Sequence, residues 1–150
     1  MRAMMRMDLK PIGFVRSPYK TMSAAPHQGR DSEQESEIVI DEAYVPGLKD
    51  VEHHPHLIVL CWFDRADRSK LTATPPHLST EHGVFATRSP HRPNPIGFCV
   101  VDLIERNGRV LRVRGLDAIH GTPVLDIKPY SFGIDCVPRR NTEIKSNTSG

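Results

Sequence analysis

The chain has few cysteines, and nothing in their spacing suggests that they form a structural site. Cys61, Cys99 and Cys136 are odd in number, lie far apart and show no C-x-x-C pattern. Neither a disulfide framework nor a zinc ribbon is therefore indicated. This cysteine usage is typical of a reducing compartment, and we expect a cytoplasmic protein.

Long hydrophobic runs are also missing. No apolar stretch approaches the ~18–20 residues of a membrane-spanning helix, so we expect no membrane partner. Residues 1–7 carry two arginines but no apolar region of the export-signal kind follows them, and we expect a flexible leader there.

An excess of one charge sign is absent as well. The 150 residues include 20 basic and 18 acidic side chains, a net charge of +2. Contact with nucleic acid must then come from local clusters of basic residues, and we expect no DNA partner. The length fits one domain that buries roughly 68–70% of its unfolded surface.

Helical periodicity is scarce, and short β-type apolar runs dominate the chain. Only residues 42–53 show a helical pattern, which Pro46 and Gly47 shorten. No helices alternate with the strands, so a doubly wound nucleotide-binding sheet is disfavoured and a closed or nearly closed barrel fits better. We predict an all-β fold with minor helix, a single-domain β-barrel over residues 8–137 and a flexible tail over residues 138–150. The expected strands are residues 12–15, 38–40, 57–63, 84–86, 96–104, 110–116 and 123–127.

Asn107-Gly108 lies between two of the expected strands. This dipeptide strongly favours a two-residue hairpin turn in which both central residues have positive φ. We therefore predict a type I′ turn centred on Asn107 and Gly108, which makes the flanking strands antiparallel neighbours.

The most informative segment is residues 83–98, which contain two arginines and three prolines between apolar stretches. Each proline fixes its own φ and holds the preceding residue in extended geometry, so the loop is stiff without being regular. A stiff loop can aim Arg88 and Arg92 before a ligand arrives, which lowers the ordering cost of binding. The loop is predicted to belong to a binding site.

A second segment, residues 116–130, leaves a strand, turns at Gly121 and becomes extended again. The two-residue period of a strand places Asp126, Lys128 and Tyr130 on one face. These residues can belong to a site. The alternative is that Asp126 and Lys128 form a surface ion pair of little energetic value.

Together these motifs resemble the TsaA-like family, the TrmO-type S-adenosylmethionine-dependent tRNA methyltransferases. Residues 83–97 match the family signature almost letter for letter, and residues 121–130 match its closing signature. Further likeness runs through residues 11–19, Pro26-His27-Gln28, His56-Leu57 and Trp62-Phe63-Asp64. The resemblance covers nearly the whole chain.

The resemblance implies a β-barrel methyltransferase that forms a homodimer, with the cofactor S-adenosyl-L-methionine near the subunit interface. It also implies transfer of a methyl group to the exocyclic amine of threonylcarbamoyladenosine, next to the anticodon of a tRNA substrate. Carried over by position, the cofactor contacts are Gln28, Phe63, Asp64, Arg88, Phe98, Ile119, His120, Gly121 and Thr122.

The chemistry of these side chains suits that cofactor. An arginine such as Arg88 can hold the amino-acid carboxylate with two hydrogen bonds, and Phe63 and Phe98 can form apolar walls. Both aromatics can equally be ordinary core residues. The acceptor amine must lose a proton, and Asp126 and Tyr130 are the candidate catalytic bases.

Two departures from the family pattern leave another function open. His120 stands where the family usually has aspartate, and the chain ends soon after the closing signature, where many bacterial members continue into a further domain. The alternative is a non-catalytic S-adenosylmethionine-binding or sensor protein, or a methyltransferase with a different acceptor.

Basic residues and histidines cluster in places. Arg65, Arg68 and Arg92 are the candidate substrate-binding residues, because with Lys70, Arg139 and Arg140 they can line a track for RNA phosphates. The alternative is a solvated loop that serves solubility. The histidines show no metal-ligand spacing, and adjacent His53 and His54 rarely reach one ion, so we expect no metal.

Overall fold

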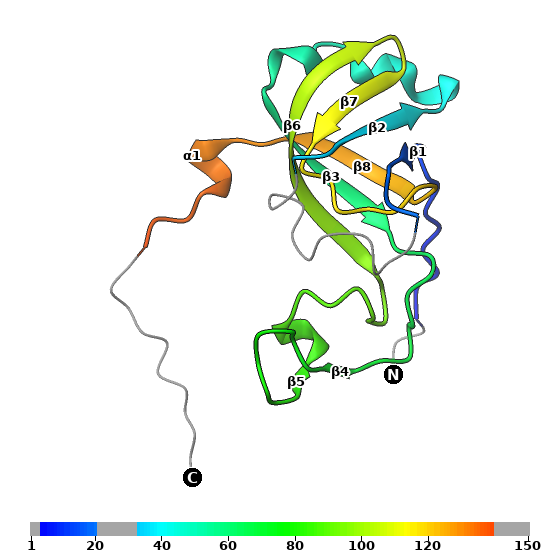
Figure 1. Ribbon diagram of the computed structural model, residues 1–150. Coiled ribbons are helices and arrows are strands. Elements are labelled where there is room, and N and C mark those ends of the chain that lie inside the picture. The colour runs from blue at the N-terminus through cyan, green and yellow to red at the C-terminus, as the bar shows by residue number, and fades with distance from the viewer. Residues whose placement is uncertain (1–3, 21–32, 140–150) are drawn as a thin grey trace.

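The computed structural model describes residues 4–20 and 33–139, and in this part of the chain six strands close into a barrel in the order β1-β2-β7-β6-β3-β8 (Figure 1). All neighbouring strands in it are antiparallel. The bounds are β1 Gly13–Arg16, β2 Glu35–Ile40, β3 His56–Trp62, β6 Ile96–Asn107, β7 Val110–Arg114 and β8 Pro123–Pro129. The predicted barrel is confirmed.

The barrel interior is filled by alternate residues of its strands, as a two-residue period requires. Leu111 and Val113 of β7 are fully buried, and β3 contributes Leu57, Val59 and Cys61 in the same way. Where β1 crosses β2 the backbones approach so closely that a methyl group on Gly13 would overlap the Val39 carbonyl. Glycine is required there because it lacks a side chain.

Residues 63–95 leave the barrel between β3 and β6 and form a separate excursion below it in Figure 1. This excursion contains a short strand pair, β4 Thr72–Ala73 with β5 His82–Gly83. The 3-10 turn η4, Val84–Ala86, follows. The prediction of a strand at residues 84–86 is therefore wrong: only Val84 is buried, and Phe85 is 82% exposed, so no alternating face forms.

The β6–β7 hairpin forms, but its turn differs from the prediction by one residue. Asn107 pairs with Val110, which makes Gly108 and Arg109 the central residues. Gly108 has a φ of 61°, while neither Asn107 nor Arg109 has a positive φ. A positive φ at the first central residue alone is the signature of a type II′ turn rather than type I′.

The segment predicted as one helix, residues 42–53, consists of two 3-10 helices, η2 Glu42–Leu48 and η3 Val51–His53. Asp50 separates them in the left-handed region, at a φ of 68°. Pro46 cannot supply the backbone donor that a continuous α-helix needs, which explains the tighter, interrupted form.

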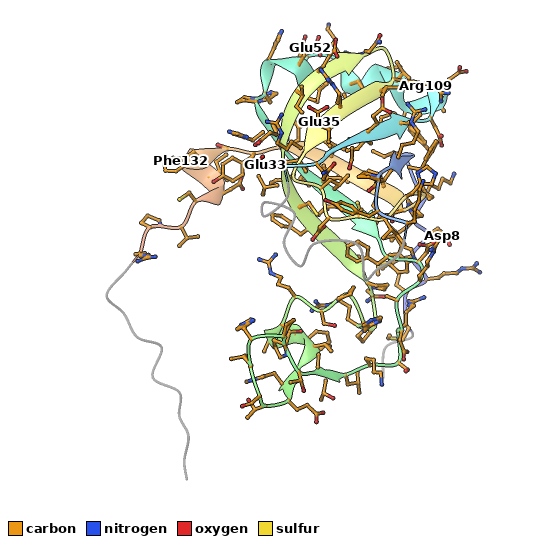
Figure 2. The ribbon with its side chains drawn as sticks, in the orientation of Figure 1. Asp8, Glu33, Glu35, Glu52, Arg109 and Phe132 are labelled. Atoms are coloured by element: carbon orange, nitrogen blue, oxygen red, sulfur yellow. The ribbon has the colours of Figure 1, made fainter. Side chains whose placement is uncertain are left out.

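After β8 the chain leaves the barrel through the short helix α1, Phe132–Asp135, which stands clear of the strands in Figures 1 and 2. Three large apolar residues of this region are almost fully solvent-exposed: Phe132 (75%), Ile134 (82%) and Val137 (81%). No helix in the described part of the chain is long and apolar enough to cross a membrane.

Candidate functional site

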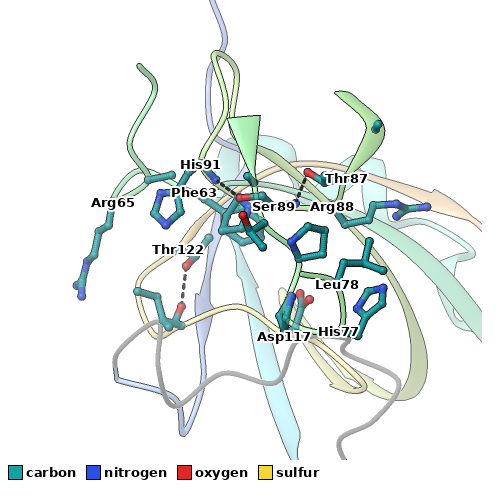
Figure 3. A pocket seen from close by; sticks show the side chains of 18 of the residues that line it. Phe63, Arg65, His77, Leu78, Thr87, Arg88, Ser89, His91, Asp117 and Thr122 are labelled. Atoms are coloured by element: carbon teal, nitrogen blue, oxygen red, sulfur yellow. Dashed lines mark hydrogen bonds between the residues drawn. The ribbon is translucent and has the colours of Figure 1, made fainter. Parts of the chain in front are cut away.

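A cleft of about 950 Å³ lies between the excursion and one end of the barrel (Figure 3). Three stretches of chain line it: residues 63–66, residues 73–91 in part, and the segment from Asp117 to Thr122. Its volume lies within the range of small-molecule sites. Of the predicted cofactor residues it contains Phe63, Asp64, Arg88, Ile119 and Thr122.

The loop that carries Arg88 is held from within by Arg92. The Arg92 guanidinium donates hydrogen bonds to three backbone carbonyls, those of Val84 (2.8 Å), Ser89 (3.1 Å) and Thr87 (3.2 Å). The loop is thus stiff, as its prolines predict, but Arg92 supplies much of the stiffness itself. A guanidinium with three partners inside its own loop is poorly placed to bind RNA phosphates, and Arg92 does not line the cleft.

A second arginine supports the same loop from outside. Arg68 donates to the Pro93 carbonyl at 2.8 Å and to the Asn94 side chain at 3.3 Å, and its guanidinium lies 5.1 Å from the Trp62 ring centroid. Beside it the Asp67 backbone N–H donates to Nδ1 of His91 at 2.9 Å. The start of the excursion is thereby tied to the end of the signature loop, which fixes one wall of the cleft.

Phe63 forms the apolar wall that the sequence predicts. Its backbone N–H donates to the Pro95 carbonyl at 2.8 Å, and its ring lies directly over Gly97. Any side chain at position 97 would overlap the ring. The glycine that ends the signature loop is therefore required by packing against the wall of the cleft.

Arg88 stands at the mouth of the cleft, on the side where β6 begins. Its guanidinium lies 5.7 Å from the ring centroid of Phe98, which is 50% exposed. In the described part of the chain Arg88 has no hydrogen bond or ion pair. Phe98 does not line the cleft itself, so its part is to support the guanidinium. An exposed guanidinium held by a ring is well suited to bind a carboxylate.

The glycine turn forms as predicted. Gly121 has a φ of 88°, which disfavours other residues, and its N–H donates to the Val15 carbonyl at 2.8 Å. The His120 N–H donates to Tyr19 and the Thr122 hydroxyl donates to the Ile119 carbonyl, both within the protein. These donors are thus in use, and the turn meets the cleft through Ile119 and Thr122 rather than through Gly121 or His120.

Asp117 is a cleft residue that the sequence reasoning missed. It lies three residues after the end of β7, and its Oδ1 is 2.6 Å from the Cys99 sulfur, which donates to it. Burial raises the pKa of the Asp117 carboxyl and that of the Cys99 thiol. Desolvation likewise raises the pKa of Cys61 to about 12. An acidic residue that interrupts the apolar run Leu116–Ile119 was the available signal.

Other predicted residues lie elsewhere. Asp126 lines a smaller cavity of about 490 Å³ beneath η2, forms an ion pair with Lys128 at 3.0 Å, and does not contact the cleft. Tyr130 packs edge-on against His56 on the outside of the barrel. Arg65 lines the cleft edge and, in Figure 3, points away from its middle. Gln28 and Arg140 lie outside the described residues.

The surface ion pair considered for Asp126 and Lys128 is thus present, with both side chains about half exposed. Neither Asp126 nor Tyr130, the two candidate bases, lines the cleft. In the described residues no group of three or more histidine, cysteine or acidic side chains is placed to hold a metal ion.

Residues 14–136 match a family described as the tRNA-methyltransferase O N-terminal domain. The chain belongs to this TrmO family. It is 34% identical to TrmO from Pseudomonas aeruginosa, whose crystal structure superposes with a TM-score of 0.76 over 93% of this chain and 63% of that one. The family predicted from the sequence is confirmed.

Curated relatives extend the comparison. A probable S-adenosyl-L-methionine-binding protein of Archaeoglobus fulgidus is 63% identical over 134 residues, 89% of this chain but 37% of that protein. A second protein of that organism, named an S-adenosyl-L-methionine-binding protein, is 56% identical over 87% of this chain and 94% of its own length. The tRNA (adenine(37)-N6)-methyltransferase of Escherichia coli is 36% identical over 82% of this chain and 57% of its own length.

The TrmO signature residues thus converge in part. Phe63, Asp64, Arg88, Ile119 and Thr122 share one cleft, and Phe98 braces Arg88. Together with Asp117, this set fits a sulfonium amino acid attached to a nucleoside. It offers one guanidinium for a carboxylate, the two carboxyl groups of Asp64 and Asp117 for cationic or hydroxyl groups, and an aromatic wall. The fit agrees with the cofactor named for the relatives.

Proposed function

We propose that this protein transfers a methyl group from S-adenosyl-L-methionine to the exocyclic amine of threonylcarbamoyladenosine next to the anticodon of tRNA. Membership of the TrmO family supports the methyl transfer, and the name of the Escherichia coli relative supports an adenine of tRNA as the acceptor. The observation that supports S-adenosyl-L-methionine as the methyl donor is that Arg88, Phe63 and Asp117 lie in one cleft.

In this proposal Arg88 binds the cofactor carboxylate, Phe63 packs on an apolar part of the cofactor, and Asp64 and Asp117 accept hydrogen bonds from its amino or hydroxyl groups. The bound cofactor supplies an activated methyl group, so the protein mainly has to position donor and acceptor. Ile119 and Thr122 close the floor, and Gln28, His120 and Gly121 remain proposed contacts.

The RNA-binding surface is proposed around Arg65 at the edge of the cleft. Arg65 is exposed, and no hydrogen bond or ion pair of its side chain occurs in the described residues. A free guanidinium can neutralise a phosphate and release its counterions. Arg68 is partly occupied by the loop, so we rank its contribution to RNA binding below that of Arg65, and Arg92 below both.

A homodimer is proposed through the outer face of β8, β3 and β6. Successive cross-strand pairs place Ile58 beside Val100, Leu60 beside Phe98 and Trp62 beside Ile96 on this outside face. Phe98 and Ile96 are 50% and 44% exposed. Ile58 is buried, so the exposed apolar surface lies toward Phe98 and Ile96. Exposed large apolar side chains on a barrel exterior are typical of a protein interface.

The alternative function is that of a protein that binds S-adenosylmethionine without transferring its methyl group, or that uses another acceptor. The two Archaeoglobus relatives are named only for binding. His120, in place of the usual family aspartate, leaves the cleft contacts intact because its side chain does not line the cleft. Both functions therefore share one cofactor site and differ in whether the methyl group is transferred and to which acceptor.

A methyl-transfer assay separates the two functions. Protein, tritiated S-adenosylmethionine and tRNA are incubated, with tRNA that carries or lacks the threonylcarbamoyl group. We expect label only in the modified tRNA, and none with Arg88→Ala. Cofactor binding without label in either tRNA would support the binding protein, and label in both would require another acceptor.

A further inference from the structure

The signature loop carries an exposed aromatic ring that belongs neither to the barrel core nor to the lining of the cleft. Phe85, in the middle of η4, is 82% exposed, the most exposed aromatic side chain in the described part of the chain. Val84 before it is buried, and Ala86 and Thr87 after it line the cleft. Since consecutive Cα atoms are about 3.8 Å apart, the Phe85 backbone lies one residue from the cleft wall while its ring is in solvent.

The backbone that carries Phe85 is held at the residue before it. The Val84 N–H donates to the Leu71 carbonyl at 2.9 Å. The Val84 carbonyl accepts hydrogen bonds from the Thr87 N–H (3.1 Å), the Thr87 hydroxyl (3.0 Å) and the Arg92 guanidinium (2.8 Å). Phe85 is thus presented on a fixed turn, and only its side-chain rotamer has to be ordered when a partner binds.

The charge around Phe85 favours RNA as that partner. Residues 63–95 contain five basic and three acidic side chains, so this segment holds the whole net charge of +2, and the rest of the chain is neutral on balance. Arg88 follows Phe85 by three residues, and Lys70 adjoins the residue whose carbonyl holds the turn; both are exposed. Aromatic rings among basic side chains are typical of sites for single-stranded nucleic acid, in which bases stack on the rings and phosphates are neutralised.

The position of Phe85 beside the cleft suits a base next to the acceptor. An exocyclic amine reaches a cleft only if its base leaves the stack of its neighbours. The neighbouring base then loses a stacking partner, and an exposed ring one residue from the cleft wall can replace it. Every base has a flat face for such a contact, so stacking on Phe85 does not depend on base identity.

We infer that Phe85 stacks on an unpaired base of the RNA beside the nucleotide whose amine enters the cleft, and holds that nucleotide at the cleft. This inference rests on the proposed function. Phe85 acts by binding alone, so no proton or group passes through it. Because base faces are covered in a duplex, the contact selects single-stranded loops over paired RNA and reads no sequence.

RNA binding by Phe85 variants tests the inference. With an unmodified tRNA transcript as the probe, Phe85→Ala lowers the affinity about tenfold. Phe85→Trp keeps the wild-type affinity, whereas Phe85→Leu, which is apolar but has no aromatic face, loses nearly as much as the alanine variant. A fully paired RNA duplex of the same length binds wild type and Phe85→Ala equally.

Two controls remove exposed side chains that do not line the cleft. Phe132→Ala removes an aromatic ring that is 75% exposed, and His54→Ala removes an exposed histidine. Both variants keep the wild-type affinity for tRNA. Phe85→Ala binds S-adenosylhomocysteine as the wild type does, because Phe85 does not line the cleft.

Salt dependence distinguishes a stacking contact from a charged one. Phe85→Ala leaves the slope of log affinity against log salt concentration unchanged, because no phosphate contact is lost. Arg65→Ala lowers that slope by about one. A reduced slope in Phe85→Ala would show that the substitution disturbs the neighbouring basic residues, and would overturn the stacking contact.

Three further results overturn the inference: wild-type tRNA affinity in Phe85→Ala, an equal loss of affinity for tRNA and duplex, and a changed oligomeric state in sedimentation without a change in RNA affinity. The last result would assign Phe85 to a protein interface. Failure of the proposed function is distinguishable from these. A wild type that transfers no methyl group, but whose tRNA binding depends on the aromatic face of Phe85, refutes the reaction and keeps the RNA contact.

Discussion

The Phe63 ring lies directly over Gly97, in the space that a side chain at position 97 would fill. Phe63 directly follows β3, the strand that enters the excursion, and Gly97 is the second residue of β6, the strand that leaves it. The same contact joins the two ends of the excursion and forms the apolar wall of the cleft. The last glycine of the signature loop therefore has a packing role that couples the fold to the site.

Gly97→Ala is expected to destabilise the protein by about 1–3 kcal/mol, because the Phe63 ring must move out of a packed position. Cofactor affinity should fall with it, since the ring is part of the cleft. Denaturant unfolding and calorimetric titration measure the two effects. Gly83→Ala is the matched control, because a methyl group there meets nothing within 4 Å. Equal stability of the two variants would contradict this role of Gly97.

Arg92→Ala is expected to loosen the signature loop, since three carbonyls lose their donor. We expect cofactor affinity to fall about tenfold. In the wild type the loop is already ordered before the cofactor binds, whereas in the variant binding must also order the loop, which costs free energy. Limited proteolysis should show new cleavage within residues 84–95. Arg109→Ala, on the barrel in Figure 2, removes one bond to the Ile40 carbonyl and should leave affinity unchanged. An Arg92→Ala protein with wild-type cofactor affinity and wild-type protease resistance would show that the Arg92 hydrogen bonds do not hold the loop in place.

Asp117→Asn is expected to make the protein more stable and bind the cofactor more weakly. Burial raises the Asp117 pKa above its ordinary value of 3.8, so folding favours the protonated form. Its contribution to stability is fully present below that value and is lost as the pH rises through the folded pKa. The stabilisation by asparagine should therefore be seen at pH 7 and vanish near pH 4. Urea unfolding at both pH values measures the free energy of unfolding. An Asp117→Asn protein that is less stable than the wild type at pH 7 would contradict the predicted stabilisation.

Thiol labelling should distinguish the three cysteines. Cys136 is exposed, whereas Cys61 and Cys99 are buried and their raised pKa values keep them as thiols at neutral pH. In native protein at pH 7.5, a thiol reagent is expected to modify Cys136 rapidly and the other two only after unfolding, as mass spectrometry of peptides would show. Rapid native labelling of Cys99 would mean that solvent and reagent reach the buried side of Asp117, where the Cys99 sulfur lies.

The sequence predicts the barrel well because its strands are short apolar runs. Burial alternates along β1 and β7, and three consecutive residues are buried in β2 and in β3. The prediction fails at residues 84–86, where three apolar residues form a 3-10 turn outside the barrel. It also misses the short β4–β5 pair, which has no alternating pattern to detect. The turn at Gly108 is misplaced by one residue because cross-strand pairing, and not the Asn-Gly dipeptide, sets the register.

Within the site, sequence motifs locate Arg88, Phe63 and the Gly121 turn but not how each is used. Arg92 has the same chemistry as Arg88, and only the three-dimensional structure shows that its donors point into its own loop. Asp126 and Tyr130 lie on one face as predicted, yet that face is outside the barrel.

Calorimetric titration of Arg88→Ala with S-adenosylhomocysteine tests the central claim most directly, with the wild type and His54→Ala measured alongside. One molecule should bind per wild-type chain and per His54→Ala chain, and the Arg88→Ala affinity should be at least tenfold lower, or about 1.4 kcal/mol. Wild-type affinity in Arg88→Ala, or no binding by the wild type, would show that the cleft between the excursion and the barrel is not the cofactor site.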